Sequence, residues 1–161
     1  MIALRGKAAI GALALAACSS APAQPAGVGE WDVSKTTLAD ASGRCDPTDL
    51  EDGRKGMWCS FQPALEVGEQ AAAVDLYFGS TEPTSPVIEI QLQVKACRVE
   101  DFHAWMKTAF GNPLEFKGAR FLWENRYLLI AADMPGSASR CIVRIFPRSE
   151  QAMYDRIKRV P

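Results

Sequence analysis

Apolar and polar residues alternate along much of this chain, a pattern typical of β-strands. The cleanest alternation covers residues 88–96, in which apolar positions are separated by Glu, Gln and Lys. Further predicted strands are residues 57–62, 72–78, 119–123, 127–133 and 140–146. Because successive side chains of a strand point to opposite faces, the pattern predicts an antiparallel sheet with one buried face and one wet or lightly covered face.

The period changes from two residues to the helical spacing at two places. The first apolar helical stripe consists of Phe102, Trp105, Met106, Ala109 and Phe110. Gly111 and Pro113 favour the end of this helix. A second helix is predicted from Ser149, as its N-cap, to about Val160.

The order strands, helix, strands, helix predicts an α+β fold: an antiparallel sheet of about five to six strands with two helices packed on it. Residues 31–161 are expected to form a single domain stapled by disulfides. The segment from the first helix through Gly111-Asn112-Pro113 to Trp123 resembles the helix, Gly-x-Pro turn and β-meander of small outer-membrane assembly lipoproteins. No residue role is carried over from that resemblance.

The N-terminus has the three parts of a secretory signal, which we assign to residues 1–17. Arg5 and Lys7 precede an apolar run that is too short to span a bilayer. Leu15-Ala16-Ala17-Cys18 resembles the lipobox of a bacterial lipoprotein precursor, which implies cleavage before Cys18 and lipid attachment to that residue. The alternative is ordinary signal cleavage after Ala17, Ala21 or Ala23, which would release a soluble protein.

Residues 18–30 are predicted to be the lipidated cysteine and a flexible tether, because they are small and include two prolines. Ser19, rather than Asp, follows the cysteine. By resemblance to Gram-negative lipoproteins, this implies sorting to the outer membrane, facing the periplasm. The membrane partner would be contacted through several acyl chains, whose buried methylenes contribute about 0.8 kcal/mol each.

Composition acts mainly by excluding classes of function. Once Arg5 and Lys7 leave with the signal, 16 basic residues (18 − 2) face 19 acidic ones, a net charge of about −3. This balance argues against nucleic-acid binding, which requires a basic face. The 48% apolar content argues against general disorder.

Four cysteines remain besides Cys18: Cys45, Cys59, Cys97 and Cys141. An even number in an oxidising compartment predicts two disulfides, with three possible connectivities. We prefer Cys45–Cys59, which would fix a weakly patterned loop to a strand, and Cys97–Cys141, which would join the longest strand to the last one. A zinc site is the alternative, disfavoured because the chain has one histidine and no C-x-x-C pair. No cofactor is expected.

Few residues suggest catalysis. His103 would need a partner to act as a general base, and a surface histidine is the preferred interpretation. Asp75 and Glu89 could face each other on neighbouring strands, as glycosidase carboxylates do. They have the polar parity of their strands, so exposed sheet decoration is preferred.

Two clusters of like charge are present in the sequence. The acidic cluster is Asp46, Asp49, Glu51 and Asp52, and the basic cluster is Arg156, Lys158 and Arg159. The acidic cluster lacks the EF-hand spacing and is interpreted as a solvated loop. The basic cluster suits the C-terminal end of a helix dipole, with contact to anionic lipid as the alternative.

The sequence therefore favours a membrane-anchored envelope lipoprotein that acts as a non-enzymatic interaction or structural domain. Its partner would be an envelope protein or a cell-wall component, bound on the sheet face or a free edge strand. One alternative is an inhibitor or immunity-like protein directed against an envelope hydrolase. Another is a carboxylate-dependent envelope hydrolase that uses Asp75, Glu89 and Glu100.

Overall fold

The computed structural model describes residues 24–135 and 140–159. The predicted signal segment and Cys18 lie outside the described residues. In chain order the elements are β1 (Gly27–Val28), β2 (Trp31–Asp32), the 3-10 helix η1 (Leu38–Asp40), β3 (Arg44–Asp49), β4 (Lys55–Ser60), β5 (Leu65–Val67), β6 (Gln70–Phe78), β7 (Val87–Lys95), α1 (Val99–Phe110), β8 (Glu115–Lys117), β9 (Arg120–Glu124), β10 (Leu128–Asp133), β11 (Arg140–Pro147), the 3-10 helix η2 (Arg148–Glu150) and α2 (Gln151–Arg159).

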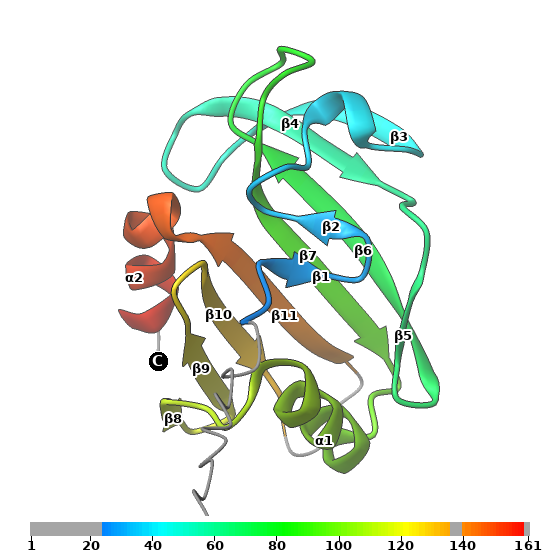
Figure 1. The fold of residues 1–161 in the computed structure, drawn as a ribbon, viewed down its shortest axis with the longest axis vertical. Coiled ribbons are helices and arrows are strands. Elements are labelled where there is room, and N and C mark those ends of the chain that lie inside the picture. Colours follow the sequence, from blue (N-terminus) through cyan, green and yellow to red (C-terminus); the bar gives the residue numbers. More distant parts are fainter. Residues whose placement is uncertain (1–23, 136–139, 160–161) are drawn as a thin grey trace, which may run out of the picture.

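One antiparallel sheet organises the molecule (Figure 1). Its strands follow the order β3-β4-β6-β7-β11-β10-β9-β8, with β5 paired to β6, which makes nine strands. The α+β class and the antiparallel sheet are confirmed, and the six predicted strands are present as β4, β6, β7, β9, β10 and β11. The predicted total of five to six strands was too small.

The strands missed by the sequence pattern are short or lie at an edge of the sheet. β3 is polar and contains Pro47, which a strand tolerates at an edge, where one side needs no ladder hydrogen bonds. β5 and β8 have three residues each. Three residues are too few to display a period, so hydrophobic alternation could not reveal them.

One face of the sheet, called the core face here, carries the main hydrophobic core. Leu76, Ile90 and Ile145 are fully buried on it. α1 packs on this face through Phe102 and Met106, and β1 and β2 cover another part of it (Figure 1).

α2 packs on the opposite face, called the second face. A smaller core joins its residues to β9, β10 and β11, and consists of Leu122, Leu129, Ala131, Phe146, Met153, Tyr154 and Ile157. The two helices therefore lie on opposite faces of the sheet. α2 covers only part of the second face, because its packing residues lie over β9 to β11, and polar side chains of β6 and β7 occupy the rest.

Both preferred disulfides are confirmed. Cys45 and Cys59 lie directly opposite each other in β3 and β4, with Cα atoms 4.0 Å apart. Cys97, just after β7, is bonded to Cys141 of β11, with Cα atoms 5.6 Å apart.

Part of the predicted tether lies on the domain. Residues 27–28 pair with residues 31–32 as a small antiparallel ladder. The Asn125 side-chain amide donates to the Pro25 carbonyl, and the Arg126 backbone N–H donates to the Gln24 side chain. Ordered packing thus begins by residue 24. None of the helices described is both long and apolar enough to cross a bilayer.

Candidate functional site

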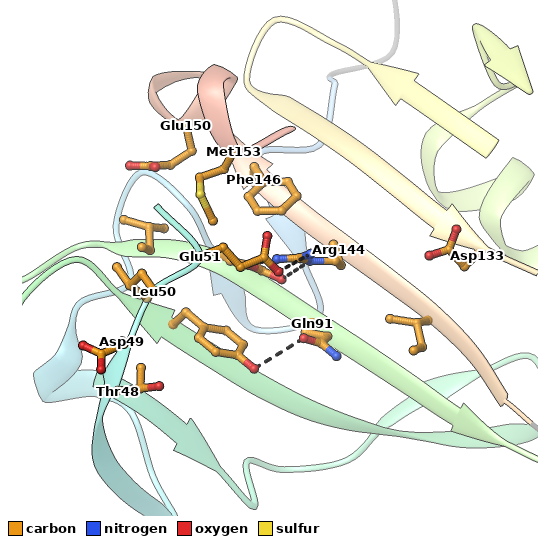
Figure 2. A pocket seen from close by; sticks show the side chains of 14 residues that line it. Thr48, Asp49, Leu50, Glu51, Gln91, Asp133, Arg144, Phe146, Glu150 and Met153 are labelled. Carbon is orange, nitrogen blue, oxygen red and sulfur yellow. Dashed lines mark hydrogen bonds and ion pairs between the residues drawn. The ribbon is translucent and has the colours of Figure 1, made fainter. Parts of the chain in front are cut away.

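A groove of about 460 Å³ lies on the second face, beside the part covered by α2 (Figure 2). Tyr77, Gln91 and Arg144 contribute to its floor from β6, β7 and β11. Residues 48–51 of β3 and the following loop line one side, and Glu150 and Met153 line the other. We call it the Arg144 groove.

Strand register brings the floor residues together. Tyr77 lies opposite Glu89 in the β6–β7 ladder, and Gln91 lies opposite Arg144 in the β7–β11 ladder. All four have the polar parity of their strands, whereas the intervening residues enter the core. The alternation that predicted the sheet therefore also places this polar row on one face.

Arg144 is the central charged residue of the groove. Its Nε and Nη2 atoms donate to the two carboxylate oxygens of Glu89 at 2.6 and 2.8 Å. Its Nη1 atom donates to Glu51 at 2.8 Å. The Glu89 side chain is only 6% exposed and that of Arg144 18%, so the bidentate pair is largely shielded from water.

The buried charges shift the acid–base behaviour of their neighbours. Burial raises the pKa of Glu89, and the hydrogen bonds from Arg144 oppose that rise. Burial alone would lower the pKa of Arg144, but Glu89 and Glu51 hold it above its ordinary value. Burial, and then the charges of Glu89 and Asp75, raise the pKa of Tyr77 to about 12. Tyr77 is therefore a neutral hydroxyl at physiological pH.

The loop after β3 is fixed to the C-terminal helix region. Arg54 pairs with Asp52 and with Glu150, each at 2.5 Å. Arg156 donates to the backbone carbonyl of Glu51 at 2.8 Å. Because these contacts join distant parts of the chain, the walls of the groove are held in place without a ligand.

The five carboxylates of the groove and the four cations that pair with them, among the residues described, leave a net charge of −1 (4 − 5). The carboxylates are Asp49, Glu51, Glu89, Asp133 and Glu150. Each one is in an ion pair, with Lys55, Arg144, Arg120 or Arg54 as the cation. A neutral polar ligand therefore suits this surface better than an anionic one, which would have to break a pair.

The floor of the groove continues into a set of side chains that we call the polar ladder: Trp58, Asp75, Tyr77, Gln91 and Gln93, of which Tyr77 and Gln91 also line the groove. The Gln93 side-chain amide donates to the Asp75 carboxylate at 3.3 Å, and the Tyr77 hydroxyl donates to the side-chain carbonyl oxygen of Gln91 at 3.4 Å. Burial raises the pKa of Asp75, an effect that the Trp58 side chain opposes.

The ladder retains unused hydrogen-bonding capacity. The side-chain NH₂ group of Gln91 donates to none of the described residues. The indole N–H of Trp58 is buried against Asp75 and is not open to a ligand. An amide donor can bind the hydroxyl groups of a ligand, and aromatic rings beside it can stack on the C–H faces of that ligand.

The structure places the sequence candidates in different regions. Asp75 and Glu89 share the second face, as their parity implied, but the prediction that Glu89 is exposed was wrong, since its residue is 4% exposed. Glu100 is exposed on α1, which packs on the core face. His103 is half-buried on α1 rather than at the open surface, its ring 5.2 Å from that of Phe121.

The acidic cluster does not converge on one point. Asp46 pairs with Arg44, Asp49 with Lys55, Asp52 with Arg54 and Glu51 with Arg144. Within residues 24–135 and 140–159, no three His, Cys, Asp or Glu side chains are grouped to hold a metal ion. In the basic cluster, Lys158 pairs with Glu115 at 3.2 Å and Arg159 donates to the Asp155 carbonyl at 3.0 Å.

Sequence reasoning missed Arg144 as a central residue. Its signal was present but indirect: an arginine between Ile142 and Phe146 in a strand that packs on both faces requires an acidic partner. Comparisons with protein-family models, with curated proteins and with solved structures find no match to this chain.

Proposed function

We propose that this protein is a lipid-anchored, non-enzymatic binding domain of the bacterial cell envelope, and that its polar ladder binds a neutral glycan of the cell wall. The observation that carries the proposal is the part of the second face that α2 leaves uncovered. There, ordered amide, carboxyl and hydroxyl groups flank two aromatic rings. Sugar hydroxyls both donate and accept hydrogen bonds, and sugar C–H faces stack on aromatic rings. The polar side chains of the ladder could therefore bind the hydroxyls, and its aromatic rings could stack on the C–H faces.

The ion pairing of the carboxylates in the adjoining groove favours a neutral ligand over an anionic one. The five carboxylates are already in ion pairs, so an anionic ligand would gain little net attraction. The groove walls are fixed by Arg54 and Arg156, so binding requires little ordering of the loop. Pre-organisation of this kind lowers the entropic cost of binding.

The hydrolase alternative has less support. Of its three candidate residues, Glu89 makes two hydrogen bonds to Arg144 and is shielded from water. It is therefore poorly placed to exchange a proton with a substrate or to attack one. Glu100 lies on a helix of the other face, so it cannot complete a carboxylate pair with Asp75.

The binding proposal predicts that Gln91→Ala weakens the affinity for cell-wall glycan about fivefold. A lost hydrogen bond to a ligand costs roughly 1 kcal/mol, and about 1.4 kcal/mol corresponds to a factor of ten. Co-sedimentation of the protein with insoluble cell wall, over a range of protein concentrations, measures this affinity.

The control is Lys35→Ala, which alters an 81% exposed side chain beside β2, away from the ladder. Its affinity should equal that of the unmodified protein. If the unmodified protein fails to sediment with cell wall, or if both variants lose affinity equally, glycan binding by the ladder is refuted.

The anchoring part of the proposal is tested separately with Cys18→Ala. Without the sulfur there is no acyl attachment, so the variant should be released from the membrane fraction by an alkaline wash, whereas the unmodified protein stays. A variant that resists the wash as fully as the unmodified protein would refute lipid attachment at Cys18.

A further inference from the structure

Two exposed apolar side chains lie at one edge of the sheet. Among the described residues the large apolar side chains that are strongly exposed are Phe61, Leu114 and Phe116, at 81%, 69% and 72%. Leu114 directly precedes β8 and Phe116 lies within it, and β8 is the terminal strand of the sheet. Apolar residues on an uncovered edge strand favour aggregation unless another surface covers them.

Phe116 is supported by the fold beneath it. Its ring centroid is 6.3 Å from that of Phe121, which in turn is 6.2 Å from that of Trp123. Trp123 is buried and donates through its indole N–H to the Gly111 carbonyl at 2.9 Å. The row of rings therefore runs from the core to the surface, and holds the exposed side chain in place.

Cations surround this edge. Lys117 follows Phe116, and a hollow beside it is lined by Lys117, Arg120, Lys158 and Arg159, together with Asp133. Glu115 pairs with both Lys117 and Lys158. Lys158 also lies 4.0 Å from Glu124, so the four cations and three carboxylates leave a local charge of +1 (4 − 3). Aromatic and aliphatic side chains flanked by Lys and Arg are the composition that associates with an anionic bilayer surface.

The chain enters the domain near the same edge. Gln24 and Pro25 accept hydrogen bonds from the turn that joins β9 to β10, and β9 is the strand paired with β8. Six residue steps separate Gln24 from Cys18, a reach of at most about 20 Å even when fully extended. An acylated Cys18 would therefore hold the β8 end of the sheet close to the membrane.

The geometry points to a membrane-docking surface at the β8 edge, formed by Leu114, Phe116, Lys117 and Lys158, whose partner is the surface of an anionic lipid bilayer. This inference rests on the proposed lipid anchor. It adds that the domain lies on the membrane in a fixed orientation, with the aromatic edge inserted among the headgroups.

The test uses the full lipidated protein in vesicles of phosphatidylglycerol and phosphatidylethanolamine, with Phe116→Trp as the probe. Brominated acyl chains quench tryptophan at the interface. We expect the additional emission from position 116 to fall at least twofold in brominated vesicles. Phe61→Trp is the matched control, because Phe61 is also exposed but follows β4, toward the opposite edge of the sheet. Its additional emission should not change.

Equal emission from position 116 in brominated and unbrominated vesicles overturns the docking surface. So does a blue shift at position 116 that depends on protein concentration without lipid, since that result assigns the edge to a second copy of the chain. Retention after an alkaline wash reports the anchor independently. Protein that is retained but not quenched would therefore support lipid attachment and refute only the docking surface.

Lys117→Glu provides a second readout that does not depend on a new tryptophan. Reversing this charge should weaken quenching of Phe116→Trp in phosphatidylglycerol vesicles by more than half, while Lys35→Glu should not. If both reversals act equally, the effect is one of net charge, and a specific surface at β8 is refuted.

Discussion

Replacing Arg144 with methionine should lower the free energy of unfolding by about 3–5 kcal/mol, the usual result of leaving one member of a buried ion pair without its partner. Glu89 would keep its buried position but lose both hydrogen bonds that now satisfy its carboxylate. Urea denaturation at pH 7, followed by tryptophan fluorescence, measures the loss.

Two controls separate the buried pair from general damage. Glu51→Gln removes the other partner of Arg144, but that side chain is 53% exposed, so the expected cost is below about 1 kcal/mol. The double variant Glu89→Leu/Arg144→Met replaces the whole pair with apolar groups and should recover most of the stability. If Arg144→Met lowers the free energy of unfolding no more than Glu51→Gln does, the buried Arg144–Glu89 pair is not a major source of stability.

The pH dependence of Arg144→Met follows from the same contact. Without Arg144, burial raises the pKa of Glu89 unopposed, so the folded state holds a proton that the unfolded state releases. Stability is then greatest below the unfolded-state pKa of glutamate and decreases as pH rises through the folded-state pKa. The variant should therefore regain stability between pH 7 and pH 5. A loss of stability over that interval would contradict the assignment.

Local patterns were sufficient for the longer strands. The alternation in residues 88–96 identified β7 and the face of each of its side chains, because a two-residue period is a property of the strand itself. Such a period requires only neighbouring residues. The pairing of Cys97 with Cys141 was preferred among three connectivities because it would join the end of one predicted strand to another, and the structure confirms it.

The groove could not be predicted, since it depends on non-local strand order. Glu89 meets Arg144 only because β7 pairs with β11 and not with the next strand in the chain. The spacing of Met153 and Ile157 predicts an apolar helix side but contains no information about which face of the sheet it covers. Phe116 was assigned to no predicted element, because β8 is too short to show a pattern.

The two proposed surfaces are compatible in space. The sheet order places β8 at one end, and β3, whose residues line the groove, at the other. A domain docked on the membrane through β8 would therefore present the polar ladder and the groove away from the bilayer. On the periplasmic side of an outer membrane, that is where the cell wall lies.

Loss of the Cys97–Cys141 disulfide should have the other large effect. In the variant Cys97→Ala/Cys141→Ala, the unfolded chain is released from a loop with a sequence separation of 44, which costs about 4 kcal/mol by the loop-closure estimate. Both sulfurs are also buried, at 7% and 0% residue exposure, so their removal adds a packing loss. Urea denaturation under non-reducing conditions measures the change.

Cys45→Ala/Cys59→Ala is the matched control for this experiment. Its loop has a sequence separation of 14, and the same estimate gives about 3 kcal/mol. The control joins an edge strand to its neighbour, whereas Cys97–Cys141 joins the central pair β7 and β11, on which the alignment of Gln91 with Arg144 depends. We therefore expect cell-wall binding to weaken more in Cys97→Ala/Cys141→Ala than in the control. The opposite ranking, in stability or in binding, would show that the edge disulfide is the one that holds the site together.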